Sequence, residues 1–226
     1  MLMIVGVVLL LLALILPGVW VRHVLVRHSS ARVDFPGTGG DMARHLVNKL
    51  QLANVVVEAT EQGDHYDPQQ RAVRLTADKL DGKSLTAVVV AAHEVGHAWQ
   101  HQRGERMFYW RQGLVTLAIW MQRLAPVALL LSPLLLAVQP GLSRWTLLAA
   151  VLAMSINALV QLVTLPVELD ASFNKALPLL QQGQYLDQQD MVAARQILKA
   201  AALTYVAGSL ASLLNVWRWL RFLRRW

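Results

Sequence analysis

Apolar residues form long runs at the start, in the middle and near the end of the chain. Residues 1–21 (MLMIVGVVLLLLALILPGVWV) carry no charge, and further apolar stretches cover residues 118–138, 145–166 and, more weakly, 200–217. A bilayer span needs about 20 consecutive apolar residues. The pattern therefore predicts a mainly α membrane protein with three to four transmembrane helices, of which the second and third form a hairpin.

The first apolar run is followed by basic residues, at Arg22, Arg27 and Arg32. A cleaved signal peptide is the alternative to an uncleaved anchor, but its basic residues usually precede the apolar core. We therefore favour the anchor. Because cytoplasmic flanks are enriched in Lys and Arg, the segment after the run is expected to face the cytoplasm. This predicts a multi-pass protein of the inner (plasma) membrane.

Polar residues concentrate between the first and second apolar runs. GTGGDMARHLVNKLQL has helical spacing, NVVVEA has the composition of a short strand, and HYDPQQRAVRLT predicts a β-hairpin. SLTAVVVAAHEVGHAWQHQ predicts a helix with Ser84 as its N-cap. Together they predict a small α+β domain. The hairpin strand Ala72–Thr76 is expected to pair with an extended peptide by strand addition.

Composition limits the chemistry that the chain can perform. Hydrophobic residues make up 55% and charged residues 15%, against about 25% charged in soluble domains. There is no cysteine, so disulfides and thiolate metal ligands are excluded. The net charge of +7 would allow nucleic-acid binding, but basic flanks of membrane segments explain it more simply. We therefore expect a lipid bilayer, and no nucleic acid, as a partner.

The segment AAHEVGHAWQH (residues 91–101) contains His-Glu-x-x-His. On a helix, His93 and His97 lie one turn apart and can bind one tetrahedral Zn²⁺. Glu94 is rotated by about 100° from His93, which suits a general base that activates water without binding the metal. A chance match on a solvated helix is the alternative, and the apolar run before His93 argues against it. These residues predict one zinc ion per chain.

The third zinc ligand must come from elsewhere. His101 lies about 12 Å along the helix from His93. One zinc ion with bonds near 2 Å therefore cannot bind His93, His97 and His101 together. Glu168, in VTLPVELDAS, follows the third apolar run. Two predicted spans separate it from His97, so both would lie on the same side of the membrane. The sequence therefore predicts His93, His97 and Glu168 as the metal ligands.

The blocks DHYDP, VRLT, VAAHEVGHAWQHQ, QLVTLPVELDAS and AAALTYVA together resemble the YugP-type neutral zinc metallopeptidases, a bacterial membrane family. The resemblance implies a zinc-dependent membrane protease with a zincin-like domain, with His93 and His97 as ligands and Glu94 as catalytic acid/base. ELDAS is also similar to the Glu-x-x-Ala-Asp pattern of HtpX-type gluzincins, in which the Glu is the third ligand. Here Ser172 stands where that pattern has Asp.

These observations predict a domain order. It comprises an anchor (1–21), a cytoplasmic zincin-like domain (22–112), a transmembrane hairpin (113–166), a cytoplasmic segment with the third ligand (167–199), and a fourth transmembrane or interfacial helix with a basic tail (200–226).

The predicted function is a membrane-anchored zinc endopeptidase that cleaves a peptide or membrane-protein substrate near the cytoplasmic surface. The alternative is a non-catalytic membrane scaffold with a structural zinc. Residues expected to support the site or contact substrate are His101, Asp170, Ser172, His65 and Tyr66. Nothing in the pattern indicates a cleavage rule, a regulator or an oligomeric state.

Overall fold

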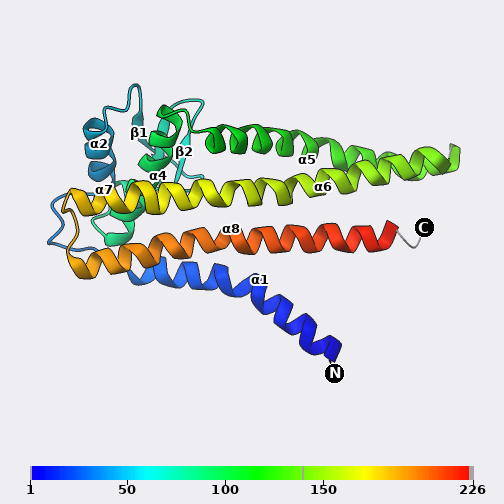
Figure 1. The fold of residues 1–226 in the computed structure, drawn as a ribbon, viewed down its shortest axis with the longest axis horizontal. Helices are drawn as coiled ribbons and strands as arrows, with labels where there is room; N and C mark the ends of the chain where they lie inside the picture. The colour runs from blue at the N-terminus through cyan, green and yellow to red at the C-terminus, as the bar shows by residue number, and fades with distance from the viewer. Residues whose placement is uncertain (1, 139, 224–226) are drawn as a thin grey trace. The chain divides into compact units, whose positions relative to one another are not determined.

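The chain is mostly helical in its computed structural model, which describes residues 2–138 and 140–223 (Figure 1). In chain order the elements are α1 (Leu2–Arg27), α2 (Gly39–Lys49), β1 (Val56–Ala59), β2 (His65–Asp67), β3 (Ala72–Leu75), α3 (Ala77–Leu80), α4 (Leu85–Gln102), α5 (Arg106–Val138), α6 (Pro140–Leu169), the π-helix η1 (Asp170–Ala176), α7 (Leu177–Gln182) and α8 (Gln188–Leu223).

The contacts divide the chain into two compact units. Unit 1 comprises residues up to 14, residues 109–165 and residues from 205, so it contains most of α5 and α6. Unit 2 comprises residues 15–108 and 166–204. It contains the sheet, α2, α4, η1 and α7, and every residue of the predicted metal site.

The prediction of three to four transmembrane helices is wrong. Among the residues that the structure describes, no helix combines the length and the apolar composition that a bilayer span requires. In α5, for example, the apolar sequence is interrupted by Arg111, Gln112, Gln122 and Arg123. The fold is therefore a mostly helical chain with a small three-stranded sheet.

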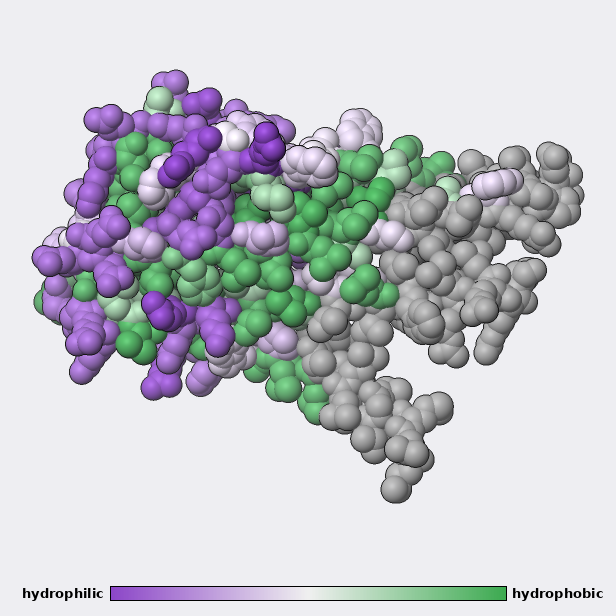
Figure 2. Space-filling model, viewed as in Figure 1, coloured by the Kyte–Doolittle hydropathy of each residue, from purple (hydrophilic) through white to green (hydrophobic). Residues whose placement is uncertain are grey.

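Unit 2 is built around α4, which is buried over most of its surface. Ser84 caps this helix as predicted, since its hydroxyl accepts a hydrogen bond from the backbone N–H of Ala87 at 3.1 Å. Helix α2 packs against α4 (Figure 1) and begins with a capping box, in which Thr38 and Asp41 each accept a bond from the other's backbone N–H. The strands and α7 complete the apolar core. Hydrophilic side chains gather over α2 and the sheet (Figure 2).

The sheet has the strand order β1-β3-β2. Strands β2 and β3 pair antiparallel, so the predicted hairpin is confirmed, whereas β1 pairs with β3 in parallel. Strand β3 therefore has a neighbour on both sides. The expectation that the Ala72–Thr76 strand would pair with a peptide is wrong, because a central strand has no free edge. Within the described sheet, the edges belong to β1 and β2.

Candidate metal centre

Helix α4 presents two imidazoles from consecutive turns. The rings of His93 and His97 lie 4.7 Å apart between centroids and are nearly perpendicular, at 80°. His97 is 4% exposed, and His93 is partly buried. The preceding apolar residues of α4 fill the core of unit 2, and this burial fixes which way the two histidines point.

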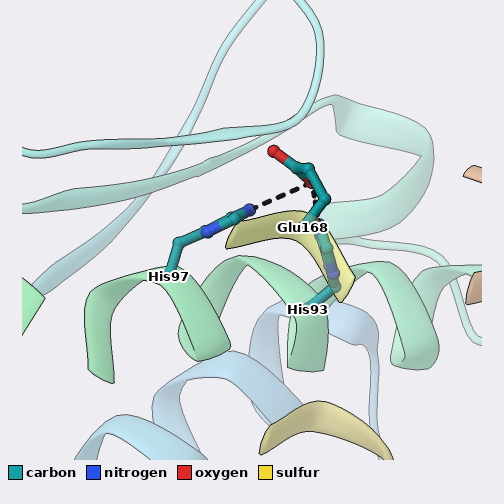
Figure 3. A group of neighbouring side chains, drawn as sticks. All are labelled: His93, His97 and Glu168. Carbon is teal, nitrogen blue, oxygen red and sulfur yellow. Dashed lines mark hydrogen bonds and ion pairs between the residues drawn. The ribbon is translucent and has the colours of Figure 1, made fainter. Parts of the chain in front are cut away.

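Glu168, in the last turn of α6, brings a carboxylate to both rings (Figure 3). Its Oε2 lies 3.1 Å from His93 Nε2 and 3.3 Å from His97 Nε2. Among the described residues, these three form a group whose ligand atoms all lie within 4.8 Å of one another. The structure thus brings together the three residues that the sequence indicated as ligands.

The spacing of these atoms fits zinc. Bonds of about 2.0–2.1 Å in a tetrahedral site place neighbouring ligand atoms about 3.3–3.4 Å apart. The two distances from Glu168 Oε2 to the imidazoles, 3.1 and 3.3 Å, are close to that value. Two imidazoles and one carboxylate are also the donor set of catalytic zinc sites that keep a fourth position open.

The two buried carboxyls of the site have opposite pKa shifts. Burial alone would raise the pKa of Glu168, but the charge of His97 and hydrogen bonds with His93 and His97 hold it well below its usual range. Burial raises the pKa of Glu94, and the neighbouring histidines only partly oppose that effect. One carboxyl is therefore held as an anion suited to a cation, and the other is suited to accept and release a proton.

Gly96, inside the motif, allows η1 to approach α4. A Cβ atom at this position would lie 2.8 Å from the backbone oxygen of Ala171. Real Cβ contacts are essentially never that short. The glycine therefore permits the close packing that sets Glu168 and the start of η1 against the two histidines.

The sequence pattern of the family described as "Putative neutral zinc metallopeptidase" matches residues 2–224. The chain belongs to this zinc metallopeptidase family. A relative from Bacillus subtilis (strain 168), named "Putative membrane protease YugP", is 33% identical over 194 residues, which is 85% of this chain and 83% of that protein. No solved structure matches the chain.

Within this family member, Nδ1 of each candidate ligand histidine has its own partner. Ser172 Oγ lies 3.1 Å from Nδ1 of His93, and Gln100 Oε1 lies 2.9 Å from Nδ1 of His97. Both partners are about 1% exposed. Ser172, which replaces the Asp of the gluzincin pattern, therefore contacts one of the candidate ligands directly.

Asp170 supports the site through Gln100. It accepts hydrogen bonds from Gln100 Nε2 at 2.8 Å and from Asn174 Nδ2 at 2.9 Å, and it pairs with Lys175. Burial alone would raise the pKa of Asp170, but the hydrogen bonds from Lys175, Gln100 and Asn174 lower it to about 2. Lys175, itself buried, also pairs with Glu105 at 2.8 Å.

The remaining candidates lie outside the three-ligand group. His101 is one turn beyond His97; its Nδ1 lies 2.8 Å from the Tyr66 hydroxyl, and its ring stacks on Phe108 at 5.3 Å. Burial, followed by the charge of Arg71, lowers the pKa of His101. His65, on β2, has its Nδ1 2.8 Å from the carbonyl oxygen of Gly63. Tyr66 and His101 thus form a pair, and His65 contacts the turn before β2.

Sequence reasoning missed Gln100, Lys175 and Phe108. Gln100 could have been found, because it lies three residues after His97 and therefore on the same face of the helix. Phe108 gave no such signal, since it comes after the turn that ends α4. Its ring nevertheless lies 6.5 Å from that of His97.

Proposed function

We propose that the chain is a zinc-dependent endopeptidase with one zinc ion held by His93, His97 and Glu168. The observation that carries this proposal is the convergence of two imidazole Nε2 atoms on one buried carboxylate oxygen, with Glu94 buried on the same helix. A structural zinc site would use a fourth protein ligand. The group of three candidate ligands among the described residues therefore favours catalysis over a scaffold.

The proposed reaction is hydrolysis of a peptide bond. A zinc ion held at this site would polarise the scissile carbonyl and lower the pKa of the attacking water. Glu94 takes a proton from that water and delivers it to the leaving amine. Its buried position suits both steps, because the raised pKa lets its carboxyl hold the proton between them.

The outer edge of β2, opposite β3 in the described sheet, is the proposed binding place for an extended peptide. Strand β2 packs against α4, and Tyr66 on this strand contacts His101 on that helix. A peptide added to β2 would form backbone hydrogen bonds like those that β2 makes with β3. Tyr66 and His101 would then contact the substrate from one side.

We also propose that the protein acts at the cytoplasmic surface of the plasma membrane. The name of the Bacillus relative supports the membrane location, and the basic residues that follow the first apolar run carry the charge that the anionic cytoplasmic leaflet attracts. Gln62 is exposed in the loop before β2, and the chain has no cysteine, so Gln62→Cys introduces a single thiol. In intact cells an impermeant thiol reagent should leave it unlabelled, and it should react once the cells are opened. Labelling in intact cells would place the domain on the other side.

The test of the catalytic proposal is Glu94→Gln, with Glu61→Gln at an exposed position as the matched control. Glu94→Gln should keep one zinc per chain by metal analysis and lose peptidase activity, because an amide cannot accept the proton. Glu61→Gln should retain both. Near wild-type turnover by the Glu94 variant would refute the mechanism, and wild-type protein that binds zinc but cleaves no peptide would support the scaffold.

A further inference from the structure

Gln100 has one of the least exposed polar side chains in unit 2, at 1%, and each end of its amide has a partner. Its Oε1 lies 2.9 Å from Nδ1 of His97. Its Nε2 donates to the carbonyl oxygen of Val167 and to Oδ2 of Asp170, both at 2.8 Å. A glutamine amide has two N–H donors and one carbonyl acceptor, so these contacts use both donors and the acceptor.

The two partners of Nε2 determine which way the amide points. The carbonyl oxygen of Val167 can only accept a hydrogen bond, and the Asp170 carboxylate is held as an acceptor by the Lys175 ammonium. Rotating the Gln100 amide by 180° would place its oxygen against both acceptors and replace two hydrogen bonds by contacts between oxygens. The observed orientation is therefore the stable one, because a polar group that loses its partner in the interior destabilises the fold.

Because Oε1 of Gln100 must face His97, the nitrogen opposite must carry a hydrogen. A neutral imidazole has one N–H, so its other nitrogen keeps a lone pair. In His97 that other nitrogen is Nε2, which lies 3.3 Å from Glu168 Oε2 in the candidate metal site. A chain of contacts thus links an ion pair to the metal site. Lys175 pairs with Asp170, Asp170 orients the Gln100 amide, and that amide determines which nitrogen of His97 carries the hydrogen.

We propose that Gln100 is a positioning residue that fixes the tautomer of His97, with the proton on Nδ1 and the Nε2 lone pair directed at the metal position. This inference rests on the proposed function, in which His97 binds zinc. It also distinguishes the two histidines. The partner of His93 is the Ser172 hydroxyl, which can donate or accept and so imposes no tautomer. Gln100, unlike Ser172, can only accept from its histidine.

The alternative is that Gln100 only joins α4 to the start of η1. Two substitutions separate these roles. Gln100→Met keeps the length of the side chain but removes the acceptor and both donors. Gln100→Glu also removes both donors, so the anchoring bonds to Val167 and Asp170 are lost, but it keeps an oxygen opposite His97. Gln102→Met is the matched control, since Gln102 lies on the same helix and bonds Ala53 and Gln51 at the surface.

The experiment is long-range ¹H–¹⁵N NMR of the imidazoles in metal-free protein, in alkaline buffer, with the His97 signals assigned from a His97→Gln variant. Wild type, Gln102→Met and Gln100→Glu should show His97 protonated on Nδ1. Gln100→Met should show a mixture or the Nε2–H form. Because no metal or substrate is present, the result does not depend on whether the protein proves to be a peptidase.

Zinc affinity from competition with a chelator gives the second measurement. Gln100→Met should bind zinc about 10–100-fold more weakly than wild type, the usual effect of removing the partner of a histidine ligand. Gln100→Glu should bind more tightly than Gln100→Met. Wild-type His97 protonated on Nε2 would overturn the proposal even if a variant failed to fold. A Gln100→Met variant with an unchanged tautomer would overturn it as well.

Discussion

Replacing Gly96 with alanine tests how closely η1 must approach α4. The new Cβ would lie 2.8 Å from the backbone oxygen of Ala171 and 3.5 Å from both the carbonyl carbon and the Cα of that residue. Inserting a methyl group into a packed interior costs about 1–3 kcal/mol. Alanine in a helix interior gains about 0.5–1 kcal/mol over glycine. The expected net effect is a loss of up to about 2 kcal/mol in the free energy of unfolding.

Gly113→Ala is the matched control, because Gly113 is also helical and nothing lies within 4 Å of the Cβ it would gain. It should be neutral or stabilising by up to about 1 kcal/mol. Both variants are compared by denaturant unfolding without metal and by zinc competition. Only Gly96→Ala should weaken zinc binding, by about tenfold or more, since it displaces Ser172 and Glu168 from His93. Equal stabilisation by both variants, with zinc affinity unchanged, would refute the close approach.

Three further outcomes are expected. Ser172→Ala should weaken zinc binding by about tenfold in a chelator competition, because His93 Nδ1 loses its partner; unchanged affinity would contradict a supporting role. Because the pKa of Asp170 is lowered from 3.8 to about 2, its contribution to stability is present above about pH 4 and is lost as the pH falls towards 2. Unfolding of metal-free Asp170→Asn should lack that part of the pH dependence, and a curve parallel to wild type would count against it. A peptide substrate N-methylated at alternate backbone nitrogens should be cleaved more slowly than its parent if β2 binds it by strand addition, whereas equal rates would exclude pairing at that edge.

Helix α4 and its chemistry were predictable because their signals are local. An N-cap serine, an apolar run and two histidines one turn apart are all read within one stretch of sequence. Glu168 was predicted from its position after an apolar segment, although the spans invoked in that argument are not found among the described residues. The close approach of Glu168 to both imidazoles instead follows from packing of η1 against Gly96.

The parts that could not be predicted depend on contacts between distant segments. The hairpin was correct, but the sequence did not show that β1 would pair with β3 in parallel, which makes β3 central. Likewise, nothing near Gln100 in sequence indicates Asp170, 70 residues later, as its acceptor. The prediction of transmembrane helices failed because it took apolar runs as spans; in α5, for example, it gave too little weight to a polar interruption at Arg123.

The π-helix η1 has a consequence for how this segment can change during evolution. Its hydrogen bonds reach five residues back, as the bond from Leu177 N–H to the Ser172 carbonyl shows. Asp170 and Lys175, also five apart, can therefore pair, whereas in an α-helix partners lie three or four apart. A single-residue deletion here would restore ordinary helical winding and remove the wide turn that brings Asp170 and Lys175 together. The number of residues in this segment decides which of its side chains can pair. We therefore expect homologues to vary here by substitution and not by insertion or deletion.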